Sequence, residues 1–394
     1  MILKDVPGWQ YPALGDICDV RDGTHDSPKY VEDGFPLITS KNLTEDGLCF
    51  EKVNYITRED HDAIEKRSAV SDGDILYGMI GTVGNPVIVK KDRDFSVKNV
   101  AIFKFLEESL IFNKYLFYVL SSDFVARQIS KESKGGTQKF VSLKVLRGLK
   151  IPLPPLETQK KIAAVLEKTD QLRKDCKLLE QELNSLAQSV FIDMFGDVRS
   201  NSFNSKKVKF DDIFEINSKL VDPRLPEFEN LPHIGPEHLE KRTGRILPYR
   251  TAREDALVSG KFNFQKGCVL FSKIRPNLKK VAIPEFSGLC SADMYPLEAV
   301  DGVSTREFIW GLILSDAFDD YLETLPSRAN IPKINRKELA AFEFYLPDLR
   351  DQKAYSKKLA KIQEQLKQNA CLYQETENNF NALMQKAFKG KLTL

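Results

Sequence analysis

Residues suited to binding a polyanion gather in three segments of the chain. Small residues, hydrogen-bonding side chains and cations alternate along residues 21–30 and 133–139, and four basic residues lie within residues 272–280. Backbone N–H groups and hydroxyls in such loops can approach phosphates, while lysine and long amide side chains reach base edges. The three segments therefore indicate nucleic-acid binding, although solvated turns share this composition.

Signatures of catalysis are missing from the sequence. It contains no H-E-x-x-H, G-x-S-x-G or Walker motif, and its six cysteines stand singly, in neither a disulfide framework nor metal-ligand pairs. The glycines of residues 78–84 lack the spacing of a phosphate-binding loop, so we expect a hairpin there rather than a nucleotide site. We therefore expect reduced thiols and no catalytic residue, metal ion or cofactor.

The chain repeats itself about halfway along. Leu-Pro-Pro-Leu-Glu-Thr-Gln-Lys at residues 153–160 returns as Leu-Pro-Asp-Leu-Arg-Asp-Gln-Lys at 346–353, which is 193 positions later. Strand patterns at 73–77 and 87–89 return 194 positions later at 267–271 and 281–283, but the residues between them differ. A repeat unit of domain size indicates a tandem duplication in which similar scaffolds carry different loops.

Each repeat opens a long helical pattern. Prolines at 152, 154 and 155 precede the first helix, which would be about 57 Å long over residues 158–195. Coiled-coil spacing predicts an apolar seam for this helix, made of Val165, Leu172, Cys176, Leu179, Leu183, Leu186, Val190 and Met194. Asn369 and Thr376 weaken the corresponding seam of the second helix. An antiparallel, pseudo-two-fold pair of helices would hide both seams, and a parallel coiled coil between two chains is the alternative.

Composition limits the class of protein further. The chain has 394 residues, enough for two domains, and 58 basic against 56 acidic residues give a net charge of +2. Any nucleic-acid surface must therefore come from local segregation of charge. No apolar run is long enough to span a membrane and no secretion signal is visible at residues 1–8, so we expect a cytoplasmic protein.

The ordered set of motifs resembles the specificity subunit of type I restriction-modification systems. The resemblance rests on the Leu-Pro-Pro-Leu-Glu-x-Gln segment, Met-Phe-Gly-Asp at 194–197, Asp-Gly-Thr-His at 22–25 and the duplicated strands, and it covers the whole chain. It implies an α+β fold with two similar mixed α/β target recognition domains separated by two long antiparallel coiled-coil helices. The expected boundaries are 1–150 and 198–345 for these domains, and 151–197 and 346–394 for the helices.

The same resemblance implies a non-catalytic subunit that reads a bipartite site in double-stranded DNA. Two modification subunits would assemble on it, restriction subunits would join through the complex, and the helices would set the gap between half-sites. The residues that we expect at the DNA are His25, Lys41, Asn42, Lys134, Gly135, Gly136, Thr137, Gln138, Lys139, His233, Lys273, Arg275, Asn277, Arg328 and Asn330.

Two other classes of function remain open at the level of sequence. One is a scaffold whose two domains bind proteins or peptides, and the other is an enzyme built from unfamiliar residues. Salt dependence of DNA binding separates the first from a DNA reader, because counterions are released when phosphates are neutralised. Turnover by the isolated chain would identify the second.

Overall fold

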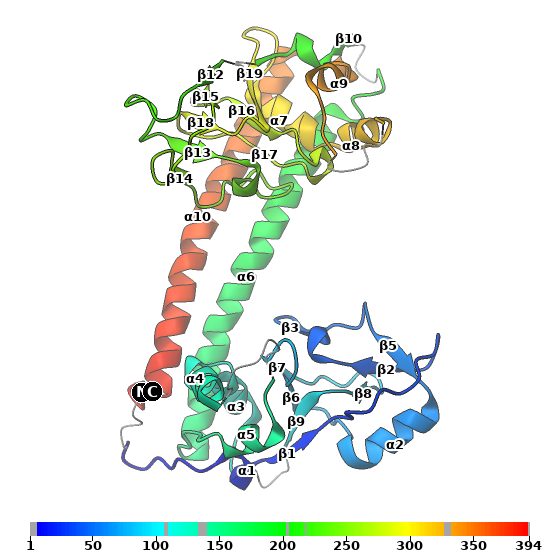
Figure 1. Cartoon of the computed structure of the whole chain (residues 1–394), viewed down its shortest axis with the longest axis vertical. Coiled ribbons are helices and arrows are strands. Elements are labelled where there is room, and N and C mark those ends of the chain that lie inside the picture. Colours follow the sequence, from blue (N-terminus) through cyan, green and yellow to red (C-terminus); the bar gives the residue numbers. More distant parts are fainter. Residues whose placement is uncertain are drawn as a thin grey trace. The chain divides into compact units, whose positions relative to one another are not determined.

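The computed structural model describes residues 6–105, 109–132, 140–201, 205–216, 219–326 and 332–392. The chain divides into two compact units, one comprising Met1–Asp175 with Tyr373–Leu394 and the other Cys176–Leu372. Two long helices, α6 (Leu156–Phe195) and α10 (Leu349–Ala387), each contribute residues to both units (Figure 1). The domain boundaries expected from the sequence therefore differ from this division, since the helices are shared.

The first unit is built around a four-stranded antiparallel sheet of order β1-β9-β6-β7. Its strands are β1 (Asp19–Asp22), β6 (Ile75–Gly78), β7 (Gly84–Ile88) and β9 (Val100–Lys104). A smaller sheet of order β5-β2-β8 and the β3-β4 hairpin lie in the same unit, formed by β2 (Phe35–Ile38), β3 (Leu43–Thr44), β4 (Gly47–Leu48), β5 (Asn54–Ile56) and β8 (Ser96–Val97). The helices of this unit before α6 are α1 (Leu14–Ile17), α2 (Arg58–Ser68), α3 (Asn113–Leu120), α4 (Asp123–Glu132) and α5 (Leu143–Gly148), with the 3-10 turn η1 at Ser40–Asn42.

The glycine-rich segment at residues 78–84 forms the β6-β7 hairpin, as the sequence predicts. Gly78 pairs with Gly84 across the two strands, and a register shift follows Leu76. A Cβ atom on Gly78 would lie 2.3 Å from the carbonyl oxygen of Thr82, so a larger residue does not fit. Gly78 therefore permits the tight backbone turn of this hairpin.

The second unit repeats the central sheet with the order β11-β19-β16-β17. Its strands are β11 (Phe214–Ile216), β16 (Val269–Ser272), β17 (Val281–Ala282) and β19 (Met294–Ala299). The remaining strands form the β12-β15-β18-β13-β14 sheet and the β10-β20 pair, with β10 (Lys206–Lys209), β12 (Leu220–Val221), β13 (Pro232–Ile234), β14 (Arg250–Thr251), β15 (Lys261–Phe264), β18 (Gly288–Cys290) and β20 (Glu343–Leu346). The helices are α7 (Arg306–Leu314), α8 (Asp316–Glu323) and α9 (Arg336–Ala340), with 3-10 turns η2 (Phe210–Asp212), η3 (Pro236–His238) and η4 (Pro276–Leu278).

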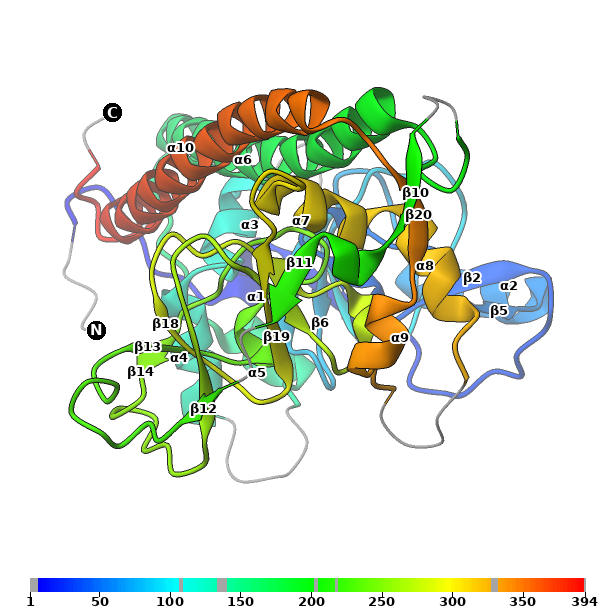
Figure 2. The same ribbon diagram turned by 90° about the horizontal axis from the view of Figure 1, so that it is seen from above.

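A helix packs between each central sheet and the long helices. In the second unit α7 occupies this position (Figure 2), and its Gly311 lies so close to Phe191 of α6 that a Cβ atom would be 2.4 Å from the ring. Phe191 also packs edge-on against Tyr355 of α10. In the first unit Tyr115 and Tyr118 of α3 pack against aromatic residues at the end of α10. Each unit thus buries its own core and includes part of both long helices.

A buried glutamine explains why the same motif begins each long helix. Gln159 is fully buried, accepts a hydrogen bond from the backbone N–H of Phe112 (2.8 Å) and donates to the carbonyls of Leu110 (3.0 Å) and Pro154 (2.8 Å). Gln352 makes the same three bonds in the second unit, with Thr305 N–H, Val303 O and Pro347 O. The duplicated sequence therefore fastens each long helix to its domain.

The long helices run antiparallel within each unit, as expected. In the second unit Phe191 contacts Tyr355, whereas Cys176 O accepts a hydrogen bond of 2.8 Å from Asn369, so the residue number falls along one helix as it rises along the other. In the first unit the beginning of α6 and the end of α10 share one core. The parallel coiled coil between two chains is therefore not supported.

The predicted seam of α6 is partly wrong. Val165, Leu172, Leu179 and Leu186 are exposed, and Leu172 retains 51% of its accessible surface. The buried face instead carries Ile162, Ala163, Leu166, Cys176, Leu183, Ala187, Phe191 and Phe195. Helix α6 packs on α10 and also on a helix of each unit, α3 in the first and α7 in the second. The buried residues of a helix packed in this way recur with a period nearer 3.6 residues than the 3.5 residues of an isolated coiled coil.

Candidate nucleic-acid interface

Backbone hydrogen bonds join the loops at one edge of the first unit. The N–H of Asn99 donates to Thr24 O (3.1 Å), the N–H of Met79 donates to Asn99 O (3.3 Å), and the N–H of Val141 donates to Met79 O (2.9 Å). These bonds bring together the 21–30 loop, the start of the turn in the β6-β7 hairpin and Val141, which lies two residues beyond the 133–139 segment. Segments far apart in the sequence thus form a single surface, which we call the first loop cluster.

The second unit repeats this framework. The N–H of Lys273 donates to Asp293 O (3.0 Å), and the N–H of Ile334 donates to Lys273 O (3.0 Å). Asp293 and Lys273 lie 194 positions after Asn99 and Met79, and Ile334 lies 193 after Val141. The N–H of Arg275 donates to Pro332 O at 2.7 Å and fixes the 272–280 segment beside residue 332. This second loop cluster repeats two of the three backbone bonds of the first, while the N–H of Asp293 donates to Ser291 Oγ instead of a carbonyl, and the side chains differ.

His25 holds the first loop cluster together. Its Nε2 lies 2.9 Å from Asp22 Oδ2 and its Nδ1 lies 2.9 Å from Asn99 Oδ1, while Arg67 forms an ion pair with the same aspartate. Hydrogen bonds with Asn99 and Asp22 raise the pKa of His25. Burial alone would raise the pKa of Asp22, but the bonds from His25 and Arg67 outweigh it and lower that pKa. Both ring nitrogens of His25 have partners, so the orientation of the ring is fixed before any contact with DNA.

Lys41 and Asn42 have different surroundings although they are neighbours. Lys41 is exposed, and its side chain has no polar partner in the part of the chain that the structure describes. Asn42 is buried; its amide donates to the carbonyls of Cys49 and Lys52 (both 3.1 Å) and accepts from Thr39 N–H (3.0 Å). Asn42 therefore shapes the loop, and the predicted direct contact with DNA through its side chain is not supported.

The basic 272–280 segment divides into anchors and exposed residues. Lys279 is fully buried and donates to Leu314 O (2.8 Å) and Ser315 O (2.7 Å), while Lys280 donates to Pro236 O (2.6 Å). Lys273 folds back onto the carbonyl of Ala292. Two of the predicted contact residues, Arg275 and Asn277, are exposed, and neither side chain has a polar partner among the residues with described positions.

His233 lies away from the surface. Its side chain is 8% exposed, and Nδ1 is 2.9 Å from Asp255 Oδ2. Its Nε2 is buried without a hydrogen-bond partner in the described chain. The expected contact of His233 with DNA stays a prediction that this position does not favour, because the buried ring belongs to β13 and is not part of the second loop cluster.

The remaining predicted contact residues cannot be placed. Lys134, Gly135, Gly136, Thr137, Gln138, Lys139, Arg328 and Asn330 lie outside the described residues. Phe140 and Lys333, which follow these segments in the chain, form bridges with Ile80 and Ile274 respectively.

Sequence reasoning missed the residues at the centre of the two clusters. Asn99 has φ +55° and its side chain meets His25, while Asp293 lies 3.6 Å from the ammonium groups of Lys273 and Lys333. The signal was present in the 194-residue offset, which aligns Asn99 with Asp293. This signal is weak in the sequence, because a polar residue in a turn between two strands has the same local pattern whether or not it has a functional role.

Among residues with described positions, no group of three or more histidine, cysteine, aspartate or glutamate side chains could hold a metal ion. None of the described helices is long and apolar enough to cross a membrane.

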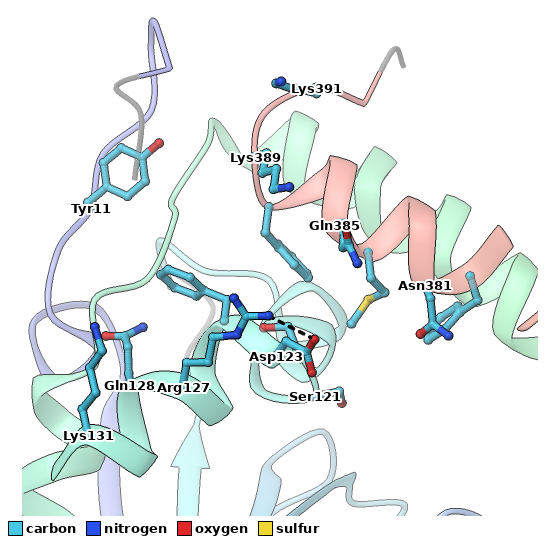
Figure 3. A pocket seen from close by; sticks show the side chains of 15 residues that line it. Tyr11, Ser121, Asp123, Arg127, Gln128, Lys131, Asn381, Gln385, Lys389 and Lys391 are labelled. Atoms are coloured by element: carbon cyan, nitrogen blue, oxygen red, sulfur yellow. Dashed lines mark ion pairs between the residues drawn. The ribbon is translucent and has the colours of Figure 1, made fainter. Parts of the chain in front are cut away.

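A pocket of about 760 Å³ lies in the first unit between α4 and the end of α10 (Figure 3). Lys131, Lys389 and Lys391 line it together with Arg127, which pairs with Asp123 at 3.7 Å. Phe388 also lines the pocket. None of the predicted DNA contacts that have described positions lines this pocket.

Comparison with known proteins agrees with this geometry. The family model described as "Type I restriction modification DNA specificity domain" matches residues 7–187 and again 204–377. The EcoDI type I restriction enzyme specificity subunit of Escherichia coli is 28% identical over 330 residues, covering 73% of this chain and 72% of the relative. The putative MjaX specificity subunit of Methanocaldococcus jannaschii is 22% identical and covers 99% of this chain and 95% of its own.

A solved structure shows the same fold. The S subunit of a type I restriction-modification system from M. genitalium has a TM-score of 0.60 at 14% identity, with 98% of each chain covered. The family model over both halves of the chain identifies a DNA-recognition protein. The chain belongs to the type I restriction-modification DNA specificity family, and its members are recognition subunits rather than catalytic ones.

Proposed function

We propose that the chain reads a bipartite site in double-stranded DNA, with one half-site for each loop cluster. The observation that carries this proposal is one backbone framework, built twice, with Asn99 and His25 at the centre of one copy and Asp293 and Lys273 at the centre of the other. Equal frameworks with different side chains suit two different half-sites. The target recognition domains are residues 1–150 and 198–345, and the helices of 151–197 and 346–394 form the spacer between them.

Exposed cations without partners favour DNA over a peptide as the ligand. Lys41 in the first unit and Arg275 with Asn277 in the second are exposed and have no polar partner within the described chain. Arginine and asparagine are the side chains that pair with guanine and adenine edges in the major groove. Because the proposed ligand is DNA, we also propose a cytoplasmic location for the protein.

Selection from a randomised duplex library by the complex with its modification subunits tests the proposal. We expect two short, unrelated sequences separated by a fixed gap, and binding that weakens steeply as salt rises. A single continuous motif or a perfect palindrome would contradict the bipartite proposal. Binding that ignores both sequence and salt would favour the protein-binding scaffold instead.

The exposed row on α6 is the proposed contact for the modification subunits. Val165 and Leu172 in the first unit, and Leu179 and Leu186 in the second, repeat every seven residues and stay uncovered in this chain. A seven-residue apolar repeat is the pattern with which helices from another chain pack. Restriction subunits would then join the complex through the modification subunits.

A substitution on this row gives a direct test. We expect Leu172→Glu to leave the thermal unfolding of the chain unchanged and to weaken assembly with modification subunits by about tenfold or more, as loss of an interface anchor does. Gln181→Glu is the control, because Gln181 is exposed and nine residues away, on the opposite side of the helix. Assembly is measured by analytical ultracentrifugation, and equal assembly of the two variants would remove α6 as the contact.

A further inference from the structure

We propose that Asp293 is a specificity-determining residue, whose carboxylate accepts a hydrogen bond from the exocyclic amino group of a base in the second half-site. The inference rests on the proposed function and assigns a chemical partner to one residue of the second loop cluster. Asp293 lies in the turn between β18 and β19 and is not among the residues that the sequence motifs single out.

The main chain fixes the position of Asp293. Its N–H donates to Ser291 Oγ at 3.2 Å, and its carbonyl accepts the N–H of Lys273 at 3.0 Å. The side chain itself remains 40% exposed. The carboxylate is therefore held on a rigid turn and still faces solvent. A group that recognises a ligand needs both properties.

Two lysines neutralise this carboxylate without occupying it. The ammonium groups of Lys273 and Lys333 each lie 3.6 Å from Oδ1, which is too long for a hydrogen bond but close enough for attraction between charges. Oδ2 has no hydrogen-bond donor among the described residues. Phosphates normally repel an acidic residue. Here the carboxylate and the two lysines together carry a charge of +1, so this repulsion is offset.

The chemistry of a carboxylate restricts what Asp293 can read. An ionised carboxylate only accepts hydrogen bonds. In the major groove the available donors are the amino groups of cytosine N4 and adenine N6, and aspartate is suited to the first. Guanine O6 and N7 and thymine O4 are acceptors, so a carboxylate rejects them.

The first domain carries a different group at the same point of the framework. Asn99 is held by the same backbone bond, from Met79 N–H, but its amide offers both a donor and an acceptor, and its Oδ1 already meets His25. One framework position thus presents an acceptor in one domain and a mixed group in the other. This difference is what distinct half-sites require.

The test compares the base preferences of variants in the complex with modification subunits, using a randomised duplex DNA library. We expect Asp293→Asn to lose about 5- to 150-fold discrimination at one position of the second half-site, the range for one base-reading pair. The first half-site should be unchanged. Asp293→Glu keeps the carboxylate and should keep the preferred base, cytosine or adenine.

Asp301→Asn is the matched control, because Asp301 is exposed beyond the other end of β19; it should change nothing. The proposal is overturned if Asp293→Asn shifts affinity equally for all sequences, or if it prevents folding and assembly, since either result makes Asp293 a structural or electrostatic residue only. Failure of the proposed function is separate, because the unmodified complex would then select no bipartite motif.

Discussion

Lys279 and Arg275 are basic residues four positions apart in one loop, and we expect opposite effects from replacing them with methionine. Both have left-handed backbone conformations, with φ +46° and +49°, so methionine meets the same backbone constraint at each position. Lys279 is fully buried, whereas Arg275 is exposed. Lys279→Met should destabilise the second unit and Arg275→Met should impair DNA reading.

The size of the stability loss follows from the partners of Lys279. Its ammonium group satisfies two carbonyls at the end of α7, Leu314 O and Ser315 O, and forms an ion pair of 2.6 Å with Asp319. Removing one partner of a buried ion pair costs about 3–5 kcal/mol. Asp319 keeps Arg242 at 3.2 Å, so we expect about 3 kcal/mol, at the low end. For a domain of this size that corresponds to a fall of about 6–12 °C in Tm.

Thermal unfolding followed by circular dichroism measures the stability effect, and selection from a randomised duplex library measures the effect on reading. Arg275→Met should stay within about 0.5 kcal/mol of the parent stability, as exposed positions do, and relax one position of the second half-site by about 1–3 kcal/mol. Well below its unfolding temperature, Lys279→Met should retain the original base preference. The reasoning is refuted if the two variants unfold together, or if Lys279→Met alters the preferred bases.

Two more predictions concern the hydrogen bonds of Gln352 and of His25. Gln352→Leu leaves the Thr305 N–H and two carbonyls without their partner, which costs about 1–3 kcal/mol for each group that water does not reach. Urea unfolding should show a marked loss of unfolding free energy. A urea midpoint equal to that of the parent chain would disprove the role of the motif. Because hydrogen bonds with Asn99 and Asp22 raise the pKa of His25, the stability that they provide is complete below the unfolded value of 6.5 and is lost as pH rises through the folded pKa. Ring proton NMR should place the titration of His25 above pH 6.5, and Asn99→Ala should lower it; an unshifted titration in the parent chain would contradict the hydrogen-bond assignment.

The sequence alone determined the architecture because duplication and hydrophobic periodicity are local, readable patterns. The two α/β domains and the long helices follow from the repeat at residues 153 and 346 and from helical spacing, and the β6-β7 hairpin follows from the glycines of residues 78–84. The antiparallel direction of the helices was expected from the duplication, but a parallel pair stayed open until the tertiary contacts were known. The family resemblance was visible for the same reason: the order and the duplication of the motifs can be recognised even though each motif alone is loosely defined.

Only the tertiary structure decided which side chains face outward. Asn42 and His233 have the composition of binding residues, yet folding directs their polar atoms inward, to Cys49 and Lys52 in one case and to Asp255 in the other. The row at Leu172 looked like a buried seam but is exposed, because α6 packs on a domain as well as on α10. Spacing along one helix does not specify how many neighbours that helix has.

The centre of each loop cluster was likewise hidden in the sequence. Asn99 and Asp293 meet their partners only through backbone hydrogen bonds between segments that are far apart in the chain. Local sequence fixes which groups a loop carries, because composition and turn chemistry act over a few residues. Which of those groups meet is decided by strand pairing over long separations, and pairing depends on the energy of the whole fold.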